Sequence, residues 1–145
     1  MNKYVLSFLI ISAFQLCSEE IVFSCRGTST CFFSMDNKNF KECYYGSNSV
    51  ELLTINKDKK VLSFGDEEVY GERAIKFQPY VVQNNEWLVF EKNSKEKETS
   101  QFLKFSQFTG ELNLRYGDSK PWEKNKSSVT NDYMCKKYNS LLDQI

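Results

Sequence analysis

The chain has 145 residues, of which 41% are hydrophobic and 15% aromatic, so it can bury one sizeable core. These values exclude an intrinsically disordered chain, which would contain fewer aromatic residues and carry more net charge. The 19 basic and 19 acidic side chains balance one another. This balance excludes a dedicated nucleic-acid binder and a polybasic membrane-surface protein, because both need an excess of lysine and arginine.

Residues 1–18 have the pattern of a secretory signal peptide. Lys3 provides the positive charge, and a short apolar run follows at 4–16. The run is too short to cross a bilayer as a helix, which takes about 20 residues, so no integral membrane span is expected after its removal. The alternative is a buried core helix. Cys17 is also a candidate for lipidation, which would make the protein an outer-membrane lipoprotein, although Leu16 before it is larger than usual at such sites.

The remaining part, residues 19–145, contains four cysteines. An even number of cysteines in a small exported protein indicates disulfides. We favour a local bridge between Cys31 and Cys43 and a long bridge between Cys25 and Cys135, although four cysteines allow three pairings. A zinc site is disfavoured because the chain has no histidine and no Cys-x-x-Cys pair.

Short apolar runs bounded by turn residues follow one another along the chain after the leader. Strands are expected at 20–27, 30–36, 40–45, 49–55, 60–65, 73–82, 86–92, 101–108, 111–116 and 128–138. A polar hairpin loop at 56–60 joins two of them, and Pro79 places its run at a sheet edge or a bulge. Residues 136–145 could form one or two helical turns.

The hairpin at 101–116 shows the strand pattern most clearly. Leu112, Leu114 and Tyr116 alternate with polar residues, which gives this arm one apolar face. Gly110 supplies the positive φ that a short loop with a bulge requires. We interpret the hairpin as architecture and expect a β-branched residue at position 110 to reduce stability.

The whole pattern predicts an all-β protein. Many short strands with turns every 8–12 residues are typical of a single antiparallel β-sandwich or a closed barrel of about eight strands. An α/β fold would need amphipathic helices of about ten residues between strands, and none is visible. The absence of repeats and of a linker rich in proline or glycine predicts one disulfide-bonded domain over 19–145.

Few residues point to catalysis. The chain has no histidine, the commonest general base and a partner of nucleophilic serine and cysteine. Glu67 and Glu68 are adjacent carboxylates, but adjacent residues on a strand point to opposite faces, so we interpret them as a solvated turn. The stretch 25–31 could cradle an anion with its backbone amides, but it lacks the lysine of a P-loop and we interpret it as a turn. We therefore predict no enzyme, no cofactor and no metal.

Three further features have plain interpretations. The charge-dense run at 91–100 is expected to be a hairpin loop. Asn125 would accept a glycan only in a eukaryotic secretory pathway. Six aromatic residues at strand positions are assigned to the core, with the lining of a ligand cavity as the alternative. They are Phe32, Phe64, Phe77, Trp87, Phe90 and Phe105.

Several short motifs near the two ends are similar to those of a loose set of small exported bacterial proteins with no assigned activity. The matching residues are Cys25 and Gly27, then Thr109 and Gly110 with Leu112 and Leu114, and then Tyr133, Cys135 and Lys136. Ser106 and Gln107 stand where those proteins tend to have aspartate and arginine. The resemblance implies a compact β-protein with linked ends, and it transfers no catalytic residue.

These observations predict an exported, non-enzymatic β-protein, periplasmic or secreted, which acts by binding or protein interaction. The alternative is a carrier of a small apolar ligand with a lipocalin-like barrel interior. The expected partner is accordingly an unknown protein or a small apolar ligand, and no nucleic acid.

Overall fold

The computed structural model describes residues 19–34, 40–46, 49–65, 74–119, 121 and 126–138. These residues form ten strands, and every pairing between them is antiparallel. The strands are β1 (Glu20–Ser34), β2 (Phe40–Tyr45), β3 (Val50–Asn56), β4 (Val61–Phe64), β5 (Ile75–Phe77), β6 (Val81–Gln83), β7 (Trp87–Ser94), β8 (Thr99–Ser106), β9 (Glu111–Asp118) and β10 (Ser127–Lys137). The predicted signal peptide at 1–18, with Cys17, lies outside the described residues. No helix among the described residues is long and apolar enough to span a membrane.

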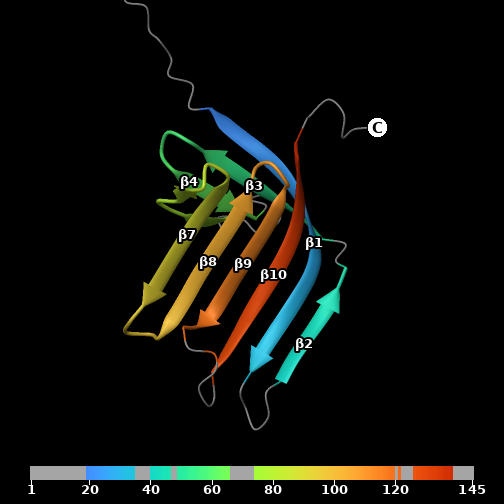
Figure 1. Ribbon diagram of the computed structural model, residues 1–145, viewed down its shortest axis with the longest axis vertical. Coiled ribbons are helices and arrows are strands. Elements are labelled where there is room, and N and C mark those ends of the chain that lie inside the picture. The colour runs from blue at the N-terminus through green and yellow to red at the C-terminus, as the bar shows by residue number, and fades with distance from the viewer. Residues whose placement is uncertain are drawn as a thin grey trace, which may run out of the picture.

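All ten strands belong to one sheet. Their order is β5-β4-β3-β1-β10-β9-β8-β7-β6, and β2 is a further neighbour of β1. Strand β1 pairs with β3 along 20–26 and with β2 along 29–34, while β10 lies along its other side. The first and last strands are therefore central neighbours, and β1 begins at the end of the sheet where β10 ends (Figure 1).

The sheet curls because its two edges are joined by a very short connection. Strands β5 and β6 stand at opposite ends of the strand order, yet only residues 78–80 separate them. Across the curl, the ring centroids of Phe77 on β5 and Phe90 on β7 lie 5.3 Å apart, and the amide of Tyr80 donates to the carbonyl of Lys60 at 3.0 Å. The prediction of an antiparallel all-β protein is confirmed. The sheet is a curled half-barrel of ten strands, rather than a two-sheet sandwich or a closed barrel of about eight.

The core fills the inner side of this curl. Alternate side chains of each strand point inward, so Leu103 and Phe105 of β8 lie beside Leu114 and Leu112 of β9 in the register. Phe23 on β1 packs edge-on against Phe105 with 4.9 Å between ring centroids. The other strands add buried apolar side chains, namely Cys25, Leu53, Ile55, Leu62, Phe64, Phe77, Leu88, Phe90 and Cys135. Full burial of such a large apolar side chain contributes about 1.5–3 kcal/mol.

The predicted hairpin at 101–116 is confirmed as β8 and β9. Gly110 has a φ of 77°, as the loop requires, and its amide donates to the carbonyl of Ser106 at 2.9 Å. The carbonyl of Gly110 in turn accepts the amide of Cys135 at 2.7 Å. The turn is therefore attached to β10 as well as to its own two strands.

The stretch 25–31, predicted to be a turn, lies in the middle of a single strand. Strand β1 runs through it without a break, and a register shift between Gly27 and Ser29 absorbs one residue as a β-bulge. The hydroxyl groups of Thr28 and Ser29 donate to the backbone and the carboxylate of Asp132 at 3.0 and 2.8 Å. Polar residues that usually favour turns are thus satisfied by the neighbouring strand β10.

In two other segments, the strands and turns have different bounds from those predicted. The run at 73–82 contains two strands on opposite edges of the sheet, because Pro79 has no amide to continue a ladder and pairing stops there. The charge-dense run at 91–100 extends β7 and begins β8, and only residues 95–98 form the turn between them.

Four of the six aromatic residues predicted for the core are buried, and two are not. Phe64, Phe77, Phe90 and Phe105 are buried. Phe32 lies on β1 beyond the bulge and is 42% exposed, while Trp87 is half-buried with the Nζ of Lys104 at 4.1 Å from its ring centroid. The prediction is wrong for these two because an aromatic side chain on a strand is buried only where another layer covers it.

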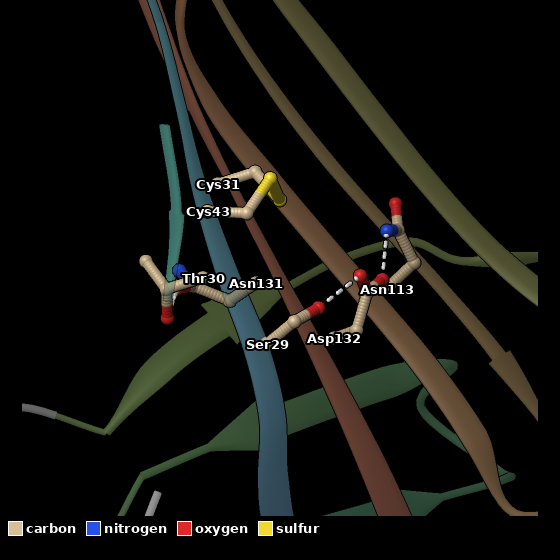
Figure 2. Close-up of a disulfide and its surroundings, with 7 residues drawn as sticks. All are labelled: Ser29, Thr30, Cys31, Cys43, Asn113, Asn131 and Asp132. Carbon is tan, nitrogen blue, oxygen red and sulfur yellow. Dashed lines mark hydrogen bonds between the residues drawn. A yellow bond between two sulfur atoms is a disulfide. The ribbon is translucent and has the colours of Figure 1, made fainter. Parts of the chain in front are cut away.

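Two disulfides fasten β1 to its neighbours. Cys25–Cys135 joins β1 to β10 across 110 residues of sequence. Cys31–Cys43, which Figure 2 shows, joins β1 to β2 across 12 residues. This is the pairing favoured from the sequence. The first bridge is buried in the core, and the second is only half-buried. Two disulfides in a chain of this size indicate that it folds in an oxidising compartment.

Tyr80, between β5 and β6, is expected to make stability fall at alkaline pH. Burial raises the pKa of its phenol above the ordinary value of 10.0, because the charged form loses its hydration. The folded state therefore retains a proton that the unfolded state releases, so stability falls as the pH rises above about 10. Urea unfolding at about pH 8 and about pH 10.5 should show a smaller alkaline loss for Tyr80→Phe than for the wild type. Tyr45→Phe, at a largely exposed side chain, should leave the wild-type loss unchanged.

Candidate functional site

The curl leaves an open cleft on its inner side, between β3–β5 and β8–β10. Its volume is about 690 Å³, within the range of about 300–1,000 Å³ found for small-ligand sites. The described lining residues are Glu51, Phe64, Gly65, Ala74, Ile75, Phe77, Gln101, Leu114, Tyr116, Asn131 and Tyr133. Some of them belong to the buried core, so the cleft continues outward from the core. Figure 1 shows that β3 and β4 lie behind one end of β8–β10 and leave the other end uncovered.

Strand register explains which side chains meet in the cleft. On β9, Leu112 and Leu114 point inward, and the two-residue period places Tyr116 on the same face. Tyr116 lies opposite Gln101 of β8, and Leu114 lies opposite Asn131 of β10. On β8, β9 and β10, the inward-facing side chains are therefore apolar in the core and become polar farther along each strand, where they line the cleft.

The cleft combines aromatic rings with a few polar groups. The rings of Phe64 and Tyr133 meet edge-on with 4.9 Å between their centroids, which fixes both side chains at the junction of the two walls. The side-chain oxygen of Asn131 accepts the hydroxyl of Thr30 at 2.8 Å, so its amide is oriented by β1 (Figure 2). Glu51 is half-buried and is the one acidic or basic side chain among the described residues that line the cleft.

Two smaller hollows adjoin the cleft. One, of about 500 Å³, shares Gln101 and Tyr116 with it and also includes Lys92 and Lys97. The other, of about 220 Å³, shares Tyr133 and is lined by Gly27, Ser29, Thr30, Tyr44, Gly46 and Ser49. Both hollows are smaller than the cleft, and the one that shares Gln101 and Tyr116 with it has basic side chains in its lining.

A polar network ties the three central strands together outside the cleft. The carboxylate of Asp132 accepts the hydroxyl of Ser29 at 2.8 Å and the amide of Asn113 at 2.6 Å (Figure 2). Alternation along β10 places Asp132 on the face opposite Asn131 and Tyr133, which enter the cleft. The network therefore holds β1, β10 and β9 in register and does not contact a ligand in the cleft.

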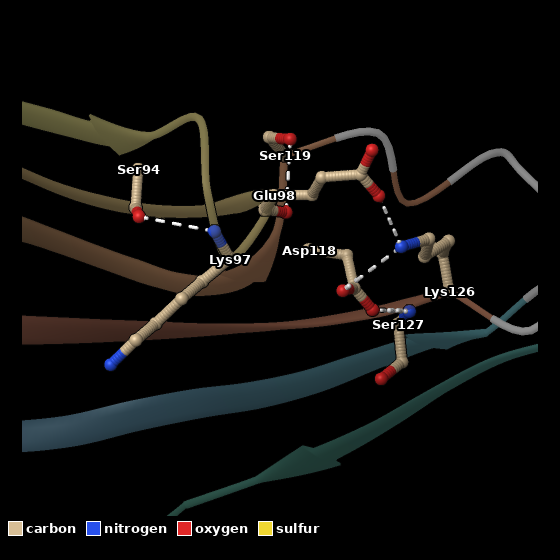
Figure 3. A network of polar contacts seen from close by, with 7 residues as sticks. All are labelled: Ser94, Lys97, Glu98, Asp118, Ser119, Lys126 and Ser127. Atoms are coloured by element: carbon tan, nitrogen blue, oxygen red, sulfur yellow. Dashed lines mark hydrogen bonds and ion pairs between the residues drawn. The ribbon is translucent and has the colours of Figure 1, made fainter.

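A second network of polar contacts links the turn between β7 and β8 to the end of β9 and the start of β10. The Nζ of Lys126 lies 2.7 Å from a carboxylate oxygen of Glu98 and 4.0 Å from one of Asp118, and the amide of Ser127 donates to Asp118 at 2.6 Å (Figure 3). Ser119 also donates its backbone amide to the carbonyl of Glu98 at 2.7 Å. Surface ion pairs of this kind contribute about 0–1 kcal/mol each, so we assign this network to ordering the ends of β7–β10.

Most residues singled out from the sequence do not belong to the cleft. Of the six aromatic residues, only Phe64 and Phe77 line it. Glu67, Glu68 and Asn125 lie outside the described residues, as does the candidate lipidation residue. In the part of the chain that the structure describes, no group of three or more histidine, cysteine, aspartate or glutamate side chains could hold a metal ion.

Sequence reasoning missed the polar lining of the cleft. Glu51, Gln101 and Asn131 carry no motif, and they come from three separate strands. Tyr116 was recognised as part of the alternating arm, but its inner position was interpreted as architecture. The sequence did contain one signal. The alternation of apolar and polar residues continues from Leu114 to Tyr116, so the inner face of this strand extends beyond the core.

No protein-family model matches this chain, and no curated protein matches it either.

Proposed function

We propose that this protein is an exported, non-enzymatic binding protein that holds a small ligand with an apolar body in the inner cleft. The observation that carries the proposal is the cleft itself, with a volume of about 690 Å³ and four aromatic side chains in its lining. Phe64, Phe77, Tyr116 and Tyr133 offer apolar area, while Gln101 offers an amide that can orient a polar group of the ligand. This is the alternative that the sequence suggested, with a half-barrel in place of a closed lipocalin-like barrel.

Export is supported by the signal-like leader at 1–18 and by the two disulfides. We infer a periplasmic or secreted location, with membrane attachment through Cys17 as the alternative. Peptide mass mapping of the non-reduced exported protein would separate them. A free N-terminus near residue 19 supports the first, and an acyl group on Cys17 supports the second.

Two observations favour binding over catalysis. The chain contains no histidine, so an acid–base reaction would have to use carboxylate, tyrosine or lysine. Among the described residues that line the cleft, Glu51 is accompanied by aromatic, aliphatic and amide side chains, and these supply no nucleophile–base pair.

A protein partner is a second candidate, favoured by exposed aromatic residues on β1 and β2. Phe32, Tyr44 and Tyr45 are 42%, 55% and 80% exposed, and the first two rings meet edge-on at 6.0 Å. Among the described strands β2 pairs with β1 alone, so its other edge could accept a strand from a partner. Aromatic residues are enriched in such interfaces.

The cleft proposal predicts a specific loss of binding in Gln101→Trp. The indole would occupy the space beside Tyr116, so the affinity for a neutral naphthyl dye should fall about tenfold or more, equivalent to about 1.4 kcal/mol. Fluorescence titration measures this change. Gln83→Trp on the exposed edge strand β6 is the matched control and should bind as the wild type does. Equal binding by Gln101→Trp and the wild type would exclude the cleft, and a wild type that binds no apolar dye would contradict the proposed function.

A further inference from the structure

A row of inward-facing side chains leads from the cleft to a lysine on β7. In the register, Tyr116 of β9 lies opposite Gln101 of β8, and Gln101 lies opposite Lys92 of β7. Leu88 and Phe90 of β7 are buried in the core, so the two-residue period places Lys92 on the inner face as well. Lys92 therefore faces the same side of the sheet as the cleft and lies one strand beyond Gln101.

Lys92 and Lys97 both line the hollow of about 500 Å³ that shares Gln101 and Tyr116 with the cleft, and we call it the basic hollow. The other described residues in its lining are Ser94, Thr99, Ser100 and Gly117. Hydroxyl, amide and ammonium groups all donate hydrogen bonds, and no acidic residue is among the described lining residues. The basic hollow therefore combines hydrogen-bond donors with positive charge, as a site for an anionic oxygen group requires.

The two lysines of the basic hollow form no ion pair with another described residue. The ion pairs nearby are those of Lys126, with Glu98 at 2.7 Å and Asp118 at 4.0 Å. Figure 3 shows the side chain of Lys97 directed away from this network. Glu51, the acidic residue of the cleft, has a partner within the chain and does not line the basic hollow. The ammonium groups of the two lysines can therefore bind an anionic group of a ligand.

We propose that the protein binds a single-chain amphiphile with an anionic headgroup, of the fatty-acid type. The apolar tail would lie in the cleft against Phe77 and Leu114. The headgroup would lie in the basic hollow beside Lys92 and Lys97. Three strand spacings separate β7 from β10, or about 14 Å at about 4.8 Å each, which an extended chain of about ten carbon atoms spans. This inference rests on the proposed function and narrows it from apolar ligands in general to anionic amphiphiles.

Three probes with the same chain length and different headgroups test the proposal on the wild-type protein. They are decanoate, decanol and decyltrimethylammonium, with affinities measured by isothermal titration calorimetry below the concentrations at which they form micelles. Decanoate should bind about three- to tenfold more tightly than decanol, because each of two partly screened lysines adds a modest attraction, and decyltrimethylammonium should bind most weakly. Added salt should reduce the preference for decanoate, because salt screens exposed charges.

Two double variants with the same change in net charge locate the headgroup. Lys92→Gln with Lys97→Gln should bind decanoate and decanol about equally. Lys41→Gln with Lys95→Gln is the matched control and should keep the wild-type ranking, because neither residue lines the cleft or the basic hollow. All four side chains are exposed, so both double variants should keep the free energy of unfolding of the wild type, which urea titration checks.

The outcomes separate this proposal from the one on which it rests. Equal binding of decanoate and decanol by the wild type, or tightest binding of decyltrimethylammonium, would overturn the selection of an anionic headgroup and leave a binding cleft in place. A preference for decanoate that survives in Lys92→Gln with Lys97→Gln would overturn the placement of the headgroup in the basic hollow. Failure of all three probes to bind, or binding that persists unchanged in Gln101→Trp, would overturn both proposals.

Discussion

Gly110→Val is expected to lower the free energy of unfolding by about 3 kcal/mol or more. Gly110 has a φ of 77°, where a side chain costs about 1–2 kcal/mol and a β-branched one costs more. A Cβ at this position would collide with the carbonyl oxygen of Cys135 and lie 3.2 Å from its carbonyl carbon. Relieving that contact requires the turn to move away from β10, which breaks the hydrogen bond from the amide of Cys135 to Gly110. Overpacking of this kind adds about 1–3 kcal/mol.

Gly46 provides the matched control for this substitution. Its φ of 75° is nearly the same, but nothing lies within 4 Å of where its Cβ would stand. Gly46→Ala should therefore cost only the conformational term of about 1–2 kcal/mol, while Gly110→Ala should cost more and Gly110→Val the most. Urea unfolding monitored by circular dichroism gives all three values. Equal losses for Gly46→Ala and Gly110→Ala would show that the contact with β10 is unimportant.

Removal of the long disulfide is expected to have an effect of similar or greater size. The double variant Cys25→Ala with Cys135→Ala should lose about 4–5 kcal/mol, because the bridge restricts an unfolded chain over 110 residues. The double variant Cys31→Ala with Cys43→Ala should lose only about 3 kcal/mol, because its bridge spans 12 residues. Since small domains are stable by about 5–15 kcal/mol, the first loss could leave part of the protein unfolded at room temperature.

Comparison of the two double variants tests the origin of this stabilisation. Free energies of unfolding from urea titrations, with the slopes checked for a change in the unfolded state, give the difference directly. The larger loss is expected for the longer loop. Similar losses for both pairs, or a larger loss for Cys31 and Cys43, would mean that packing around the sulfur atoms decides the stability rather than loop length.

Local patterns in the sequence predicted local structure well. The alternation of Leu112, Leu114 and Tyr116 after Gly110 gave a hairpin that the structure contains with the expected φ and register. Strand periodicity assigns each side chain to a face, and a glycine at a turn marks where the chain reverses. Both signals depend on neighbours within a few residues, so a single sequence contains them.

The errors arose where distant strands decide the outcome. The polar stretch at 25–31 resembles a turn by composition, but Asp132 of β10 accepts its hydroxyl groups and holds it extended. Likewise, Pro79 indicates that pairing stops, but not that the chain then crosses from one edge of the sheet to the other. Sequence periodicity contains no information on which strands become neighbours.

The candidate site was beyond prediction for the same reason. Glu51 and Tyr133 both line the cleft, although they come from the third and the last strand of the chain. Only the curl of the sheet brings the wall formed by β3–β5 over the inner row of β8–β10. Each of these residues, taken alone, is an ordinary polar or aromatic residue on a strand.

The position of the Cys25–Cys135 bridge also determines how the protein responds to mechanical force. Tension applied at the start of β1 and the end of β10 passes from one strand to the other through the sulfur atoms. The 110-residue span between these cysteines, with the cleft inside it, then carries almost no load while the bridge is oxidised. Reduction would transfer the full pull to the hydrogen bonds between β1 and β10, so that oxidation state decides whether stretching can open the half-barrel.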